Sequence, residues 1–154
     1  MNRTLSGVIL ILMVSGTTQA AAVCSLASTG VAFGSYNTLS SRETDTAGTI
    51  AVTCMGVIGE TVHYTIAIGP GSGAFSLRQM GSGDRGLHYN LFIDPNRSLV
   101  WGDGTSGTGV VSDTLVLTVP SVTKNHVVYS RIPRGQKQLA AQGYTDNLMV
   151  TLSY

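Results

Sequence analysis

The feature that most constrains this chain is a two-residue repeat of apolar side chains that recurs in short segments. In residues 61–68 the alternating apolar positions are Val62, Tyr64, Ile66 and Ile68. Successive side chains of a β-strand point to opposite faces of the sheet, so this repeat predicts a strand with one buried face. No segment shows the three-to-four-residue spacing of an amphipathic helix. The repeat therefore predicts an all-β chain.

Similar segments follow at the spacing of a β-sandwich, separated by Gly, Asp, Asn and Ser. The predicted strands are residues 30–36, 49–54, 61–68, 87–93, 99–101, 114–119, 127–132 and 144–154. Two antiparallel sheets packed face to face would bury their apolar faces. The last segment runs to Tyr154 on an inward-facing position and no return strand follows it. We therefore expect an antiparallel sandwich with an uncovered sheet edge, which would need a pairing partner.

The first residues have the composition of a secretory signal peptide. Arg3 supplies the positive charge, and the apolar run after it spans about ten residues, whereas a membrane-spanning helix needs roughly twenty. Small side chains at the required spacing predict cleavage after Ala20 or Ala22. We expect a signal peptide over residues 1–22 and one exported domain over residues 23–154, without a transmembrane segment.

The exported part contains two cysteines, Cys24 and Cys54. An even number of cysteines in an oxidising compartment indicates pairing. Closing a loop of about 30 residues would stabilise the fold by about 3–4 kcal/mol. The C-x-x-C spacing of a redox pair is absent, and two cysteines with three scattered histidines do not form a zinc site. We predict a Cys24–Cys54 disulfide and no metal.

Charge and motif content argue against several classes of function. Only 11% of the residues are charged and the net charge is +1, so no basic surface for nucleic acid is expected. The glycine-rich residues 69–73 lack the Lys and the helix of a phosphate loop, and no Gly-x-Ser-x-Gly nucleophile motif is present. We expect neither an enzyme nor a bound cofactor. The sole tryptophan, Trp101, is either a core residue or a platform for a ligand.

A series of short motifs, in order along the exported part, resembles the spore coat protein U domain family. They are Cys24, Gly30–Tyr36, Gly48–Cys54, Arg78–Met80, Leu87–Leu91, Val100–Thr105, Val128–Gln136, Gly143–Asn147 and Val150–Tyr154. This family is similar to the subunits of archaic chaperone–usher pili. The resemblance implies an immunoglobulin-like β-sandwich that lacks its last strand. It also implies three partners: a periplasmic chaperone that lends a strand, an outer-membrane usher, and a neighbouring pilus subunit.

By the same resemblance, a groove for the donated strand would lie between the first and last strands. We expect it to be lined by Val31, Phe33, Leu148, Val150, Leu152 and Tyr154. An added strand would contribute main-chain hydrogen bonds and place alternate side chains in pockets. Cleavage would leave at most residues 21–23 ahead of Cys24, so we expect the chain to accept a strand but not to donate one.

The expected function is that of a structural and adhesive pilus subunit, exported through the periplasm to the cell surface. Two alternatives remain open. One is a self-complete secreted coat or matrix protein, and the other is a carbohydrate-binding sandwich that uses Trp101.

Overall fold

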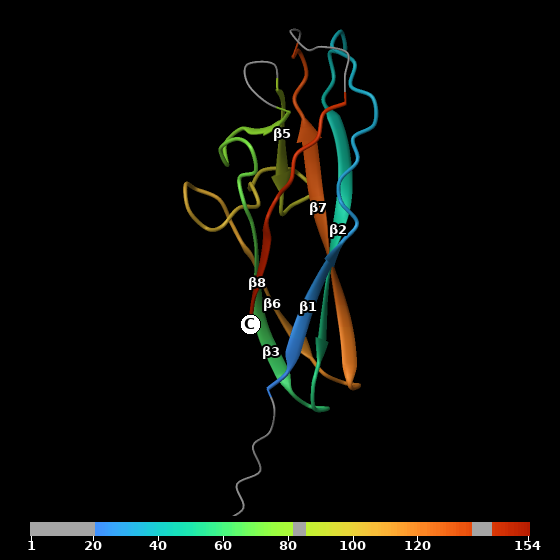
Figure 1. The fold of residues 1–154 in the computed structure, drawn as a ribbon, viewed down its shortest axis with the longest axis vertical. Coiled ribbons are helices and arrows are strands. Elements are labelled where there is room, and N and C mark those ends of the chain that lie inside the picture. The colour runs from blue at the N-terminus through green and yellow to red at the C-terminus, as the bar shows by residue number, and fades with distance from the viewer. Residues whose placement is uncertain (1–20, 82–85, 137–142) are drawn as a thin grey trace, which may run out of the picture.

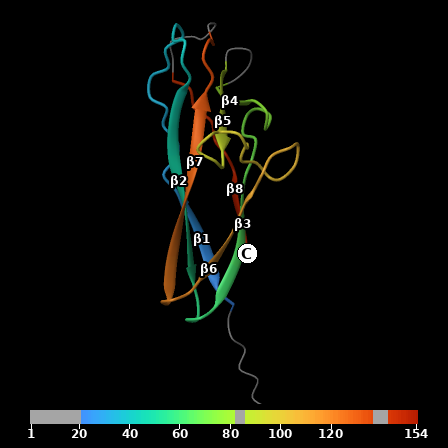
Figure 2. The same cartoon turned by 180° about the vertical axis from the view of Figure 1, so that it is seen from behind.

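Two antiparallel sheets face each other in the computed structural model, which describes residues 21–81, 86–136 and 143–154 (Figures 1 and 2). The larger sheet has the strand order β1-β2-β7-β5-β4, and the smaller has the order β6-β3-β8. The strands are β1 (Val23–Ser28), β2 (Thr44–Met55), β3 (Thr61–Ile68), β4 (Arg78–Met80), β5 (Leu87–Phe92), β6 (Val111–Val116), β7 (Ser121–Ile132) and β8 (Val150–Ser153). The expected all-β, immunoglobulin-like antiparallel sandwich is confirmed. None of the described segments is a helix long and apolar enough to cross a membrane.

The longest ladder joins β2 and β7, which pair along all twelve residues of each strand. Both strands are rich in Val, Ile and Thr, whose branched side chains suit a pleated surface. On its other side β2 pairs with β1, but only from Met55 back to Ile50. Among the described residues, no strand lies beside the remaining half of β2 on that side, and this asymmetry positions the site described below.

The core lies between the two inner faces, where the two-residue repeat places the apolar side chains. On β3 all four alternating positions are buried, as predicted. Trp101 is completely buried, and its indole Nε1–H donates a 2.9 Å hydrogen bond to the carbonyl of Ile66. The buried apolar side chains of the larger sheet are Cys24, Ile50, Val52, Cys54, Met80, Leu87, Tyr89, Leu91, Val128 and Ile132.

The first and last predicted strands are wrong in extent. Residues 30–36 form no strand; β1 lies earlier, at Val23–Ser28. Gly30 and Gly34 have φ angles of +70° and +71°, which interrupt the extended conformation that a strand needs. At the other end, β8 covers only Val150–Ser153 of the predicted 144–154.

Smaller differences concern the middle of the chain. β6 covers 111–116 rather than 114–119, and Val119, an alternating apolar position of the predicted strand, is half exposed. In the predicted strand 99–101, only Val100 and Trp101 form isolated bridges. The short β4 was not predicted, because three residues are too few to show a repeat.

Candidate functional site

A cleft of about 370 Å³ opens between the two sheets. Its floor is the inner face of the larger sheet, and its walls are the segment after β1 and the segment before β8. We call residues 30–36 the first wall and residues 143–149 the second wall. In Figure 1 the second wall is the red segment that descends to β8. The floor side chains are Ile50, Met80, Tyr89, Leu91 and Val128.

The first wall crosses closely over β2 because Gly48 has no side chain. A Cβ atom at Gly48 would lie 2.4 Å from the carbonyl oxygen of Gly30 and 2.9 Å from Val31 Cγ2. Just before the wall, the amide of Thr29 donates to the carbonyl of Thr49 at 3.0 Å, which is the last main-chain bond of this ladder. The wall therefore runs against β2 without continuing the strand pairing.

Two aromatic residues fasten the first wall to the larger sheet. The ring of Phe33 meets the ring of Tyr89 edge-on, with centroids 5.9 Å apart. The hydroxyl of Tyr36 donates to the carbonyl of Pro133 at 2.9 Å and accepts the amide of Gln136 at 3.1 Å. These contacts fix the wall through its side chains.

The second wall has its main chain fixed at two points. The amide of Gly81 donates to the carbonyl of Thr145 at 2.9 Å, and the amide of Gly69 donates to the carbonyl of Met149 at 2.8 Å. Residues of an antiparallel strand alternate in which side they bond. Since Met149 bonds toward β3, the main-chain groups of Leu148 and Val150 point to the opposite side. Within the described part of the chain, β8 pairs only with β3, so that side is an open edge.

Asp146 is the one charged side chain among the described residues that line the cleft. Its carboxylate accepts the hydroxyl of Tyr89 at 2.8 Å and the hydroxyl of Ser72 at 2.9 Å. It also accepts the amides of Ser72 at 3.2 Å and Asn147 at 2.9 Å. Burial, together with the hydrogen bond to Asp146, raises the pKa of the Tyr89 hydroxyl. Tyr89 therefore remains a donor at neutral pH.

Arg78 is completely buried and was not recognised from the sequence as a core residue. Its guanidinium donates to the carbonyls of Gly69 at 2.9 Å, Trp101 at 2.7 Å and Ile68 at 3.2 Å, and to Asn90 Oδ1 at 2.7 Å. Burial lowers its pKa, but a guanidinium stays protonated in proteins. Arg78 thus fixes the end of β3, against which β8 pairs.

The structure brings four of the six predicted groove residues into the cleft: Val31, Phe33, Leu148 and Val150. Leu152 is half-buried on the same face of β8, opposite Ile66, but it does not line the cleft. Tyr154 was expected to face inward and instead is 58% exposed, because β8 ends at Ser153.

The predicted disulfide is confirmed, and the ligand-platform alternative for Trp101 is not supported. Cys24 and Cys54 are bonded and lie directly opposite each other in the β1–β2 ladder, with Cα atoms 4.0 Å apart. Trp101 has no exposed ring face, so no ligand can stack on it in this structure.

Sequence reasoning missed the floor of the cleft and most of the second wall. Ile50, Tyr89 and Leu91 lie at alternating apolar positions of the predicted strands 49–54 and 87–93, but their common position under the cleft depends on strand order. A local pattern cannot show strand order. Asp146 had no signal of its own, because an isolated Asp between Thr and Asn is typical of a turn.

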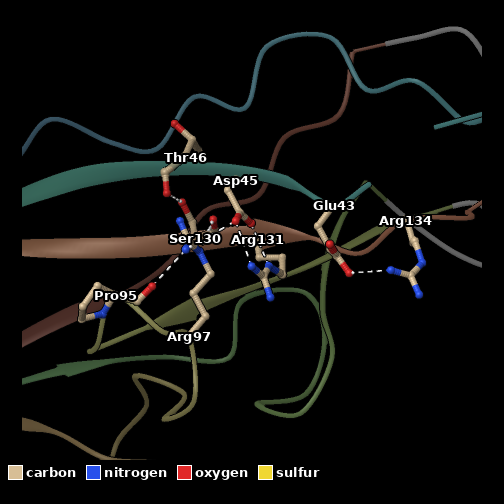
Figure 3. Close-up of polar contacts among 8 residues, drawn as sticks. All are labelled: Glu43, Asp45, Thr46, Pro95, Arg97, Ser130, Arg131 and Arg134. Atoms are coloured by element: carbon tan, nitrogen blue, oxygen red, sulfur yellow. Dashed lines mark hydrogen bonds and ion pairs between the residues drawn. The ribbon is translucent and has the colours of Figure 1, made fainter. Parts of the chain in front are cut away.

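The outer face of β2 and β7 carries charged pairs away from the cleft (Figure 3). Asp45 accepts two hydrogen bonds from Arg131, at 2.7 and 2.8 Å, and lies 3.4 Å from Arg97. The hydrogen bond from Arg131 is the main reason that the pKa of Asp45 is lowered. Among the described residues, no three His, Cys, Asp or Glu side chains gather as a metal site would require.

Comparison with known proteins identifies the family. No curated protein matches the chain. A solved structure of the CsuC–CsuE chaperone–tip adhesion subunit pre-assembly complex, from archaic chaperone–usher Csu pili of Acinetobacter baumannii, contains a chain with a similar fold. The TM-score is 0.58 at 18% identity, and the match covers 87% of this chain but 40% of that chain. The family model of the Spore Coat Protein U domain matches residues 11–151, and the chain therefore belongs to this family.

Proposed function

We propose that this chain is a structural subunit of a surface pilus, which completes its β-sandwich with a strand supplied by another protein. One observation carries the proposal. In both walls, which face each other across the cleft, alternate side chains are half-buried as in a strand (Val31 and Phe33 in the first, Tyr144, Asp146 and Leu148 in the second), yet neither wall is a strand in the structure. A segment with a strand-forming sequence and no strand beside it is what a missing neighbour would leave.

The geometry of the second wall suits an incoming strand. The main-chain groups of Leu148 and Val150 point to the open edge, where a strand could bond to them. Their side chains alternate with the exposed Asn147 and Met149. A strand laid along this edge would cover the half-buried apolar residues of both walls and remove their surface from water.

The partners follow by analogy with the similar complex, whose description names a chaperone and a tip adhesion subunit of archaic chaperone–usher pili. We propose a periplasmic chaperone as the first donor, an outer-membrane usher as the site of exchange, and a neighbouring subunit as the final donor. The chain would then act at the cell surface as a structural and adhesive component, without catalysis.

Export would require a leader, and residues 1–20, which hold most of the predicted signal peptide, lie outside the described residues. The structure favours cleavage after Ala20 over cleavage after Ala22. Ala22 is 7% exposed, and its amide donates to Glu60 Oε1 at 2.9 Å. Cleavage after Ala22 would remove both contacts. N-terminal sequencing of the exported protein should therefore begin at Ala21; a sequence that begins at Val23 would contradict this assignment.

A strand appended after Tyr154 tests the proposal without knowledge of the natural donor. This extension consists of a short Gly/Asn linker followed by about ten residues that alternate Val with Thr, the length of a long strand. It should raise the melting temperature and suppress aggregation. An extension in which Lys replaces Val is the matched control and should do neither. Equal behaviour of the two extended proteins would contradict strand acceptance.

Two substitutions locate the accepting edge. Val150→Lys places a charge in the cleft, whereas Met149→Lys changes the neighbouring residue, which is 77% exposed. Burying an unpaired ammonium is strongly unfavourable, so Val150→Lys should abolish stabilisation by the appended strand and Met149→Lys should preserve it. A self-complete coat protein, the alternative, would fold as a monomer alone and would respond to neither extension.

A further inference from the structure

We propose that Asp146 is a positioning residue that ties the second wall to the floor of the cleft and to the loop after β3, so that the open edge of the wall is already in place for a strand. The inference rests on the proposed function, because an edge held in place matters only if a strand pairs with it. It concerns the carboxylate of Asp146 with the hydroxyls of Tyr89 and Ser72, and we call these three residues the wall clamp. These three residues come from the second wall, from β5 and from the loop after β3.

The carboxylate of Asp146 is occupied by internal donors. Two hydroxyls and two amides, from Tyr89, Ser72 and Asn147, bond to its two oxygens. A carboxylate offers about four lone-pair sites, so little accepting capacity remains for an incoming chain. The residue is therefore better placed to fix the wall than to recognise a positive charge on a partner.

The clamp gives the wall a directional link to the larger sheet. Leu148 is half-buried above an apolar floor, but apolar contact is not directional and does not by itself fix where the wall lies. The hydroxyl of Tyr89, a floor residue, donates to Asp146 at 2.8 Å and so joins the wall to the floor at a defined point. Loss of this bond would free the wall to open locally.

The loop after β3 is shaped to meet the clamp. A Cβ atom on Gly71 would lie 2.3 Å from Asp146 Oδ2 and 2.7 Å from Leu148 Cδ2. Gly71 also has a φ of +66°, which favours glycine. Glycine at position 71 therefore lets the loop pass close to the second wall, where Ser72 bonds to Asp146. Nearby, the buried charge of Arg78 has Asp146 as an attractive electrostatic partner.

The test compares Tyr89→Phe with Tyr129→Phe. Each removes one hydroxyl, but Tyr129 lies on β7 outside the cleft lining. Hydrogen–deuterium exchange is measured for amides of residues 143–150, with and without the appended Val/Thr strand. Without the strand, Tyr89→Phe should speed exchange in this segment by about threefold to tenfold, the effect of one lost hydrogen bond. Tyr129→Phe should leave it unchanged.

With the appended strand in place, the difference in exchange between the two variants should disappear, because the strand itself then holds the wall. Ser72→Ala should reproduce the effect of Tyr89→Phe more weakly.

Two outcomes would overturn the clamp. One is equal exchange of residues 143–150 in Tyr89→Phe and Tyr129→Phe. The other is an equal fall in melting temperature for Tyr89→Phe with and without the strand, which would indicate a general loss of stability. Failure of the appended strand to stabilise the parent protein would count against the proposed function instead. The exchange difference measured without the strand would still decide whether Asp146 holds the wall.

Discussion

Two regions of this sandwich have similar patterns of alternating side chains and different structures. In the region of β1, β2 and β7, the two-residue repeat coincides with strand pairing, and a disulfide joins β1 to β2. In the two walls of the cleft, a similar alternation of half-buried and exposed side chains occurs in irregular segments. The difference teaches that alternation shows what a segment is able to form. Whether the strand forms depends on a neighbour that can bond to it.

The two regions are also held by different kinds of contact. The paired region has a continuous main-chain ladder and a covalent bond. The walls depend on side chains: Tyr36 bonded to Pro133, Phe33 against Tyr89, and Asp146 bonded to Tyr89 and Ser72. Fewer main-chain bonds give a lower cost of local opening. We expect the walls to exchange amide hydrogens faster than β2 and β7.

The largest expected effect lies in the paired region. Replacing both Cys24 and Cys54 with Ser should lower the free energy of unfolding by about 3–4 kcal/mol, because the disulfide closes a long loop in the unfolded chain. Urea unfolding of the parent and the double variant measures it. The loss should be the same with and without the appended strand, since the bond lies outside the cleft lining. A loss that depends on the strand would mean that the two regions are not independent.

A smaller effect is expected where the first wall crosses β2. Gly48→Ala places a methyl group against the carbonyl of Gly30 and should cost about 1–3 kcal/mol by overpacking. Amide exchange at residues 31–33 should rise at the same time. Gly143→Ala is the matched control, because no atom lies within 4 Å of its added Cβ. Unchanged exchange at residues 31–33 would show that this approach does not hold the wall.

The sequence was informative where structure depends on local pattern. Alternation identified the buried faces of β3 and β5 because the residues of each face alternate within a single strand. It failed at Arg78, whose partners are carbonyls of Ile68, Gly69 and Trp101 from other elements. Nothing near Arg78 in the sequence indicates that those carbonyls lie around it.

The cleft was predictable only in part, for a related reason. Val31, Phe33, Leu148 and Val150 were proposed from a family resemblance, and the structure places them in one cleft. The predicted first strand was placed wrongly, because Val31 and Phe33 alternate as in a strand while the backbone turns at Gly30 and Gly34. The floor needed the order of the strands, which is a property of the whole sheet.

A pH-dependent contribution is expected between the two sheets. His126 on β7 shares a 2.8 Å hydrogen bond with the hydroxyl of Tyr64 on β3, and it faces Asp113 and Lys124. Burial is the main cause that lowers the pKa of His126 below 6.5. The unfolded chain then binds the proton more readily, so this contribution is complete above pH 6.5 and is lost as the pH falls below it. His126→Gln should cost about 1 kcal/mol at pH 8 and flatten the decline of stability between pH 7 and 5. An equally steep decline in the variant would assign it to other groups.

The smallest effect is expected on the outer face of the paired region. Asp45 there is partly exposed and bonds Arg131 at two points (Figure 3). Surface ion pairs contribute little, so Asp45→Asn should cost about 0.5 kcal/mol, and less in high salt. Because the pKa of Asp45 is lowered below 3.8, its contribution to stability is present above pH 3.8 and is lost as the pH falls through its pKa in the folded protein.

Glu43→Gln, which removes a more exposed pair with Arg134, is the control and should cost less still. A change in stabilisation by the appended strand on Asp45→Asn would contradict the separation of the two regions, because this pair lies on the face that points away from the cleft.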